Sequence, residues 1–281
     1  MIEIKDLYFG YTRENLFSGL NLSLGSGNIC GLLGKNGAGK TTLLKLMAGL
    51  LFPKQGGLHI LGQAPGSRTP LFLQELILLQ EEFSLPSVSP SQYERLYSPF
   101  YPRFDASLFS HYLMEFELEP QKNLKGYSYG QKKKFLLAFG LATDCRLLLL
   151  DEPTNGLDIP SKRQFRKALA SVLREDRSVI ISTHQARDLE SLIDPIIILD
   201  EGQIVFNRTL EEISDHLSIH RLTHPPDPEE ALYAEKTLGG YLVVTQNRGE
   251  EETHIELELL FNTVIQSREK LAAVFEEVSH E

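Results

Sequence analysis

The order of apolar and polar residues predicts an α/β protein with an additional antiparallel β layer. Apolar and polar residues alternate over residues 2–24, with turns expected at Gly10 and Gly19, and this period of two predicts antiparallel strands. Four later runs are short and continuously apolar, which is typical of strands buried on both faces of a parallel sheet. These runs are residues 29–33, 76–79, 147–150 and 179–181.

Helical spacing occurs at residues 42–48 and 131–139, and between about residues 83 and 144 we expect a helical insertion. The first half of this insertion is rich in aromatic residues, most of which are expected in a helical core. Several lie among Pro86, Pro90, Pro99 and Pro102, in segments that cannot be continuous helix. Aromatic residues exposed there would suit a groove that receives a partner's helix.

The last part of the chain predicts a small α+β appendage. A hairpin turn is expected at residues 200–202, and Pro225, Pro226 and Pro228 predict a linker or a stiff bend. Residues 241–245 and 254–259 then predict a hairpin with its turn at 247–249, and residues 268–278 predict a helix. We therefore divide the chain into a main domain, residues 1–215, and an appendage, residues 216–281, packed on the main domain or across a dimer.

The net charge of −10 is concentrated in the appendage. Residues 1–210 hold 23 basic and 22 acidic residues, whereas residues 211–281 hold 5 and 16. Binding to a phosphate backbone needs a basic stripe, and residues 132–134, the only basic run, are interpreted as a solvated helix face. We therefore expect no nucleic-acid partner.

Nothing in the sequence predicts a membrane-spanning segment or a signal peptide, because the longest apolar runs are far too short. Cys30 and Cys145 are the only cysteines, which favours a reduced cytosolic setting without a disulfide. We expect a soluble chain.

A phosphate-binding loop of the form G-x-x-x-x-G-K-[ST] lies between the strand of residues 29–33 and the helix that begins near Thr42. Its residues are Gly34, Lys35, Asn36, Gly37, Ala38, Gly39, Lys40 and Thr41. The glycines allow successive N–H groups to point at one anion, and the helix N-terminus adds unpaired donors. Lys40 would reach the β- and γ-phosphates and the Thr41 hydroxyl would hold Mg²⁺, so the sequence predicts a nucleoside triphosphate site.

An acidic pair, Asp151 and Glu152, follows the apolar run at 147–150. A buried parallel strand would place this pair at the carboxyl edge of the sheet, where α/β proteins bind ligands. Asp151 is suited to support the magnesium shell, and Glu152 to accept a proton from an attacking water.

Residues 151–158, Asp-Glu-Pro-Thr-Asn-Gly-Leu-Asp, resemble the second nucleotide motif and D-loop of ABC-type ATPases. The other markers of that family occur in family order over residues 1–210. They are an aromatic at Tyr11, the Q-loop glutamine at Gln80, a signature at residues 127–131, and the switch histidine at His184. A tyrosine can stack on a purine, although a tyrosine such as Tyr11, taken alone, is more often a strand residue packed on the core.

The resemblance implies a P-loop NTPase fold of ABC type, with an antiparallel β layer, a helical subdomain at about residues 83–144 and the C-terminal appendage. It implies ATP and Mg²⁺ as cofactors, with Glu152 and His184 as catalytic residues and Thr41, Gln80 and Asp151 around the metal. ATP would contact Tyr11, Gly34, Asn36, Gly37, Ala38, Gly39, Lys40, Thr41 and Thr42 of one subunit, and Ser128, Gly130 and Gln131 of the other.

The signature departs from the family pattern L-S-G-G-Q. Ser128, Gly130 and Gln131 are retained, whereas Tyr127 and Tyr129 replace the usual leucine and first glycine. Tyr129 adds bulk at a tight subunit interface, where it either slows closure or projects away.

The function implied by the resemblance is that of an ATP-hydrolysing subunit driving a separate membrane permease. The chain would form a homodimer, or a heterodimer with a second ATPase subunit, and would be cytoplasmic and peripheral on the inner face of the membrane. Residues 100–105 resemble a short pattern of bacterial exporters and favour export. The alternatives are a soluble, non-transport ABC-type ATPase and a non-hydrolysing ATP-binding module.

Overall fold

A computed structural model describes residues 1–249 and 255–277. Its centre is a mixed sheet in the order β5-β6-β7-β3-β8-β9, in which only β9 runs antiparallel to its neighbour. The strands are β3 (Ile29–Leu33), β5 (Leu76–Leu79), β6 (Leu147–Asp151), β7 (Ser178–Thr183), β8 (Ile196–Asp200) and β9 (Gln203–Arg208). All four apolar runs of the sequence form strands of this sheet, because residues without polar side chains fit positions covered on both faces.

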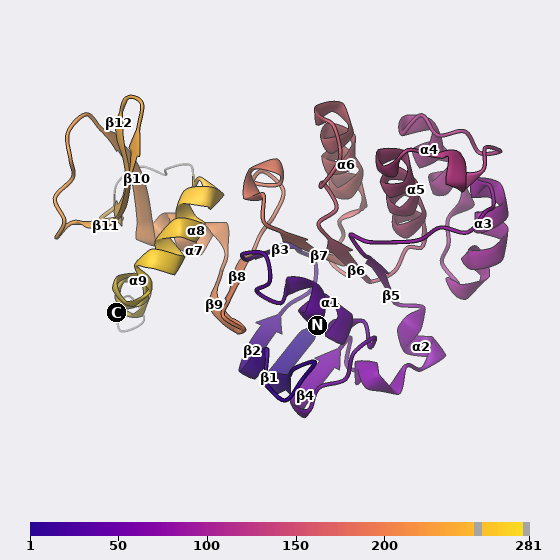
Figure 1. The fold of residues 1–281 in the computed structure, drawn as a ribbon, viewed down its shortest axis with the longest axis horizontal. Coiled ribbons are helices and arrows are strands. Elements are labelled where there is room, and N and C mark those ends of the chain that lie inside the picture. The colour runs from indigo at the N-terminus through magenta and orange to yellow at the C-terminus, as the bar shows by residue number, and fades with distance from the viewer. Residues whose placement is uncertain (250–254, 278–281) are drawn as a thin grey trace.

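A second, antiparallel sheet in the order β2-β1-β4 covers one side of the molecule (Figure 1). Its strands are β1 (Ile2–Phe9), β2 (Phe17–Leu24) and β4 (Gln55–Ile60). The predicted antiparallel layer is therefore confirmed, and the connection after Gly10 is where it was expected. The turn expected at Gly19 is wrong: Gly19 lies inside β2 with φ of 73°, where the register with β1 shifts, so the glycine allows a bulge.

Helices cover the two faces of the central sheet. Figure 1 shows α1 (Lys40–Met47) on one face and α5 (Tyr129–Ala142) and α6 (Ile159–Val172) on the other. With α3 (Pro90–Tyr97) and α4 (Ala106–Glu115), α5 forms the helical insertion, whereas α2 (Pro70–Leu73) precedes it. Phe109, Phe135 and Phe139 form its aromatic core, and Phe100 remains 68% exposed. The expected helical core is confirmed.

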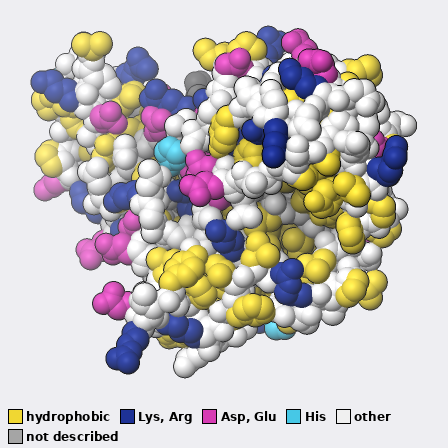
Figure 2. Space-filling view, turned by 45° about the vertical axis from the view of Figure 1, so that its right-hand side comes forward, with side chains coloured by type: hydrophobic (Ala, Val, Ile, Leu, Met, Phe, Trp, Pro, Cys, Tyr) yellow, Lys and Arg dark blue, Asp and Glu magenta, His cyan; other side chains and the backbone are white. Residues whose placement is uncertain are grey.

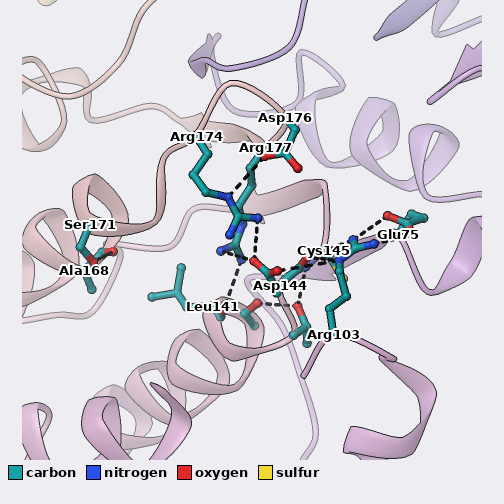
Figure 3. A network of polar contacts seen from close by, with 12 residues as sticks. Glu75, Arg103, Leu141, Asp144, Cys145, Ala168, Ser171, Arg174, Asp176 and Arg177 are labelled. Carbon is teal, nitrogen blue, oxygen red and sulfur yellow. Dashed lines mark hydrogen bonds and ion pairs between the residues drawn. The ribbon is translucent and has the colours of Figure 1, made fainter. Parts of the chain in front are cut away.

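The insertion rejoins the sheet through a polar network centred on Asp144, which lies between α5 and β6 (Figure 3). The Asp144 carboxylate pairs with Arg174 at 2.9 Å and with buried Arg177 at 3.5 Å. Its carbonyl accepts hydrogen bonds from Arg103, which also forms a two-point ion pair with Glu75. Four segments distant in sequence are therefore joined where the helical insertion ends.

The C-terminal part is α+β, as expected. It contains α7 (Leu210–His216), β10 (Leu217–Leu222), β11 (Ala231–Thr237), β12 (Gly240–Gln246), α8 (Leu257–Gln266) and α9 (Arg268–Glu277). The turn at 200–202 joins β8 to β9, and α9 confirms the predicted last helix within the described residues. The three prolines lie in the connection between β10 and β11, strands of one sheet, so they form a bend within the appendage rather than a linker between domains.

The hairpin predicted from residues 241–245 and 254–259 is wrong. Residues 241–245 lie in β12, but β12 pairs with β10 and β11. Residue 254 is outside the described residues, and α8 starts at Leu257. Leu257, Leu260 and Val264 are buried on one side of α8, so helical packing determines this segment.

The appendage packs on the main part of the chain. Arg187 forms an ion pair with Glu258 at 2.9 Å, and the Leu257 N–H donates to the Glu190 carboxylate at 2.6 Å. Our division at residues 215 and 216 stays a prediction. No helix within residues 1–249 and 255–277 is long and apolar enough to cross a membrane.

Candidate active site

The phosphate-binding loop lies between the end of β3 at Leu33 and the start of α1 at Lys40. Gly39 is the N-cap of α1 and has φ of 107°, which favours glycine. A Cβ atom at Gly39 would lie 2.8 Å from the ring of Phe17, so the close approach of β2 also requires glycine there. Asn36 and Gly37 are exposed and Ala38 is half-buried, which leaves this part of the loop accessible to a ligand.

Lys40 is buried and turns its ammonium group back over the loop. Its Nζ donates to the carbonyls of Gly34 at 2.7 Å and Lys35 at 3.2 Å, and lies 3.6 Å from Oε1 of Glu152. Burial lowers the pKa of Lys40, while the neighbouring Glu152 carboxylate acts in the opposite direction. The structure thus places the lysine between the loop and the acidic pair.

Asp151 is buried at the carboxyl end of β6 and holds two hydroxyl groups. The Thr41 hydroxyl donates to the Asp151 carboxylate, with distances of 2.8 and 3.0 Å to its two oxygens, and Ser182 Oγ donates at 2.6 Å. Ser182 lies opposite Asp151 in the parallel register of β6 and β7. The residues expected around a metal, Thr41 and Asp151, are therefore in direct contact.

Glu152 is buried and has a left-handed backbone, with φ of 45°. Its N–H donates to the carbonyl of Ser182 at 3.1 Å and to the Ser182 hydroxyl at 3.2 Å. His184 Nδ1 lies 2.8 Å from Oε1 of Glu152, at hydrogen-bond distance. The two residues expected to be catalytic are thus neighbours, and Lys40 lies beside the same carboxylate oxygen.

Tyr11 lies beyond the end of β1 and is 65% exposed, so the alternative of a strand residue packed on the core is wrong. Its hydroxyl lies 3.2 Å from Thr42 Oγ1, and its ring meets Phe9 edge to face. An exposed ring beside the start of α1 is compatible with stacking on a purine, and that role stays a prediction.

The signature residues form the N-terminal end of α5. Ser128 is the N-cap, and it exchanges hydrogen bonds with Gln131 in a capping box, which fixes both side chains. Ser128 is exposed, and α5 lies on the opposite face of the sheet from α1 (Figure 1). Gln80 follows β5 and lines a small cavity together with Lys133 and Asp151.

Tyr129 packs against its own chain. Its ring stacks on Phe83 with centroids 5.6 Å apart, and its hydroxyl donates to the carbonyl of Glu81 at 3.0 Å. A Cβ atom at Gly156 would lie 2.9 Å from the Tyr129 ring, so the segment after Glu152 also lies against it. The extra bulk in the signature therefore contacts the Q-loop and the D-loop.

Two residues of the site were missed from the sequence. Ser182 carries no motif of its own, and its position opposite Asp151 follows only once β6 and β7 are placed side by side. The expected solvated helix face is wrong for Lys133, because only 8% of its surface is exposed. Its Nζ donates to the carbonyls of Glu152 and Asn155, at 2.7 and 2.8 Å.

Comparisons with known proteins support the same interpretation. A family profile described as ABC transporter matches residues 17–155. The SkfA peptide export ATP-binding protein SkfE of Bacillus subtilis is 31% identical over 213 residues, covering 73% of this chain and 87% of that protein. The bacitracin transport ATP-binding protein BcrA of Bacillus licheniformis is 30% identical over 229 residues, covering 77% of this chain and 71% of that protein.

Among solved structures, one described as an ATP-binding subunit of an ABC transporter superposes with a TM-score of 0.70 and 25% identity. The superposition covers 76% of this chain and 91% of that chain. Sequence and fold therefore match known proteins over about three quarters of the chain.

Proposed function

Because the chain belongs to the ABC transporter family, as one of its ATP-binding proteins, we propose that it hydrolyses ATP and thereby drives a separate membrane permease. The observation that carries this proposal is the cluster formed by Lys40, Glu152 and His184 beside the pair of Thr41 and Asp151. The chain's relatives SkfE and BcrA are named as ATP-binding proteins of export and transport, which favours this function over that of a soluble ATPase of the same superfamily.

The chain's own residues can perform each part of the reaction. The backbone N–H groups of the loop and the Lys40 ammonium would bind the phosphates of ATP. Glu152 would accept the proton of the attacking water, and His184, at hydrogen-bond distance from it, would orient the carboxylate and contact the γ-phosphate. Burial of Glu152 excludes bulk water from this proton transfer.

The residues around Asp151 fit a magnesium ion. Mg²⁺ prefers oxygen ligands and usually keeps several waters, and the Thr41 hydroxyl, the Asp151 carboxylate and the Gln80 amide offer oxygens of this kind. The Thr41 hydroxyl donates a hydrogen bond to Asp151, which leaves the lone pairs of the Thr41 oxygen available. When bound, the ion would neutralise charge on the phosphates.

We further propose that two such subunits enclose ATP between them and that the permease docks on the helical insertion. Ser128, Gly130 and Gln131 lie on α5, across the sheet from the phosphate-binding loop, which suits contact with the nucleotide of a second subunit (Figure 1). Leu96, Tyr97 and Phe100 are exposed on the insertion, and Figure 2 brings that side forward and shows hydrophobic side chains on its surface. Such side chains suit a helix from a membrane subunit.

Replacement of Glu152 by glutamine tests the proposed reaction. Glu152→Gln keeps the shape of the side chain but not its basicity, so we expect ATP to bind with unchanged affinity and turnover to fall at least about 100-fold. Steady-state phosphate release and ATP titration measure the two quantities. Glu3→Gln, at an exposed carboxylate of β1, is the matched control and should behave as the wild type. Turnover near the wild-type rate in Glu152→Gln would exclude Glu152 as the base.

A wild-type protein that binds ATP without hydrolysing it would instead support the non-hydrolysing alternative. Copurification of the chain with a membrane protein from its native membrane would test the permease partner. Recovery of the chain without any membrane protein would count against transport.

A further inference from the structure

Lys133 differs from the two lysines beside it because its ammonium group is buried. It lies in α5, the helix that begins with the signature, whereas Lys132 and Lys134 are half-exposed. Its Nζ donates to the Glu152 carbonyl at 2.7 Å and to the Asn155 carbonyl at 2.8 Å. Burial lowers the pKa of Lys133, whereas the carboxylates of Glu81, Glu152 and Asp151 raise it.

The two carbonyls that Lys133 binds belong to one turn. The N–H of Asn155 donates to the Glu152 carbonyl at 3.2 Å, so Lys133 binds both ends of the turn that carries Glu152. Glu152 has a left-handed backbone, which costs a residue other than glycine about 1 kcal/mol and persists only where the surroundings hold it. Ser182 holds the N–H side of this residue and Lys133 holds its carbonyl side. Together they fix the direction in which the Glu152 carboxylate points.

A second set of contacts joins the same helix to the Q-loop and the D-loop. Tyr129 precedes Lys133 by one helical turn, and its ring centroid lies 5.2 Å from Nζ of Lys133. The Tyr129 hydroxyl binds the Glu81 carbonyl, and the Glu81 carboxylate accepts a hydrogen bond from the Asn155 side chain at 2.5 Å. The start of α5, the Q-loop and the turn after Glu152 therefore form one closed network.

We propose that Lys133 is a positioning residue for Glu152, through which the signature helix sets the general base of its own subunit. This inference rests on the proposed function, because in the proposed dimer the start of α5 contacts the nucleotide of the other subunit. Movement of α5 at one nucleotide would then change the orientation of Glu152 at the other. Lys133 itself touches the backbone of Glu152 rather than the substrate.

The test removes the buried donor while keeping an unbranched side chain that is only one atom shorter. In Lys133→Met we expect turnover to fall at least about tenfold and ATP affinity to stay within about twofold, because the phosphate-binding loop is untouched. Lys132→Met removes the same charge from the adjacent position and should leave both values unchanged. If Lys133→Met does not fold, Lys133→Gln, which keeps a single polar group, should show the same separation with a smaller loss. Unchanged turnover in the folded variant would overturn the proposal.

A double variant separates positioning from general destabilisation. If Lys133 acts only by orienting Glu152, then Lys133→Met should not slow single-turnover hydrolysis further in a Glu152→Gln background. A further loss of about tenfold there would mean that Lys133 acts elsewhere and would overturn the proposal. Wild-type turnover in Glu152→Gln would contradict the proposed function, whereas an inactive Glu152→Gln beside a fully active Lys133→Met would contradict this inference alone.

Discussion

At the scale of single residues, the ammonium group of Lys40 has three close polar neighbours. Its ammonium group is buried, binds the carbonyls of Gly34 and Lys35, and lies near the Glu152 carboxylate. A buried cation with carbonyl and carboxylate partners is held ready for a phosphate, which offers a stronger, charge-assisted hydrogen bond. We therefore propose that Lys40 acts in phosphate binding rather than in proton transfer.

We expect Lys40→Ala to weaken ATP binding at least about tenfold, because the variant removes the positive charge from the phosphate-binding loop. Calorimetric titration with ATP and Mg²⁺ measures this change. Lys45→Ala, on the half-exposed side of α1, is the control and should bind ATP as the wild type does. Equal affinities of Lys40→Ala and the wild type would contradict the assignment of the loop.

The sequence could predict residues whose role depends on spacing along the chain, such as Lys40 and Asp151. It could not single out Lys133 within three consecutive lysines. Successive side chains on a helix are rotated by about 100°, so only one of the three can point at the turn that carries Glu152. Which one does so depends on how α5 packs on the sheet, and that is decided by residues distant in sequence. The direction in which the Tyr129 side chain points could not be predicted for the same reason.

At the scale of elements, the network around Asp144 joins the helical insertion to the sheet (Figure 3). Arg177 has 2% of its side chain exposed, so its charge depends on Asp144 and on the Leu141 carbonyl, to which it donates at 3.0 Å. Arg174 meets the same carboxylate but is half-exposed. The ion pair of the buried Arg177 with Asp144 should therefore contribute more to the free energy of unfolding than that of Arg174.

We expect Asp144→Asn to lower the free energy of unfolding by about 2–4 kcal/mol, because it leaves the Arg177 charge buried with weaker partners. Asparagine tolerates the left-handed backbone of this position, where φ is 54°, so the change tests the charge rather than the conformation. Denaturant unfolding measures the loss. Arg174→Ala removes an exposed partner and should lower it by less than about 1 kcal/mol. Equal losses of unfolding free energy in the two variants would show that the burial of Arg177 does not determine the contribution of this network to stability.

Elements with long or strongly apolar patterns were predictable, whereas short patterns were ambiguous. The runs that form β3, β5, β6 and β7 could only be buried strands in this context. The alternation near residue 257 extends over few positions, too few to distinguish a strand from the first turn of a helix. The burial of Leu257, Leu260 and Val264 on one side favours the helix α8.

At the scale of the whole molecule, the residues proposed to contact ATP lie in two groups. The phosphate-binding loop, Asp151 and Glu152 follow the carboxyl ends of parallel strands, where open α/β sheets bind ligands. The signature lies at the start of α5, on the other face of the sheet from α1 (Figure 1). A site in which the exposed Ser128 faces a phosphate-binding loop across a subunit interface would need a second chain.

The last prediction tests that composite site. In the Glu152→Gln background we expect ATP to shift the elution of the protein to that of a dimer, and Ser128→Arg to abolish the shift. Ser128 is exposed at the N-cap of α5, so a large cation there would fill the space for the nucleotide of the second subunit. Loss of the cap lowers stability by only about 1 kcal/mol, so the variant should fold and bind ATP as a monomer. Ser110→Arg, on the exposed side of α4, controls for the added charge and should still dimerise. A Ser128→Arg protein that dimerises with ATP would mean that the signature lies outside the interface, and ATP-driven closure would then require a different surface.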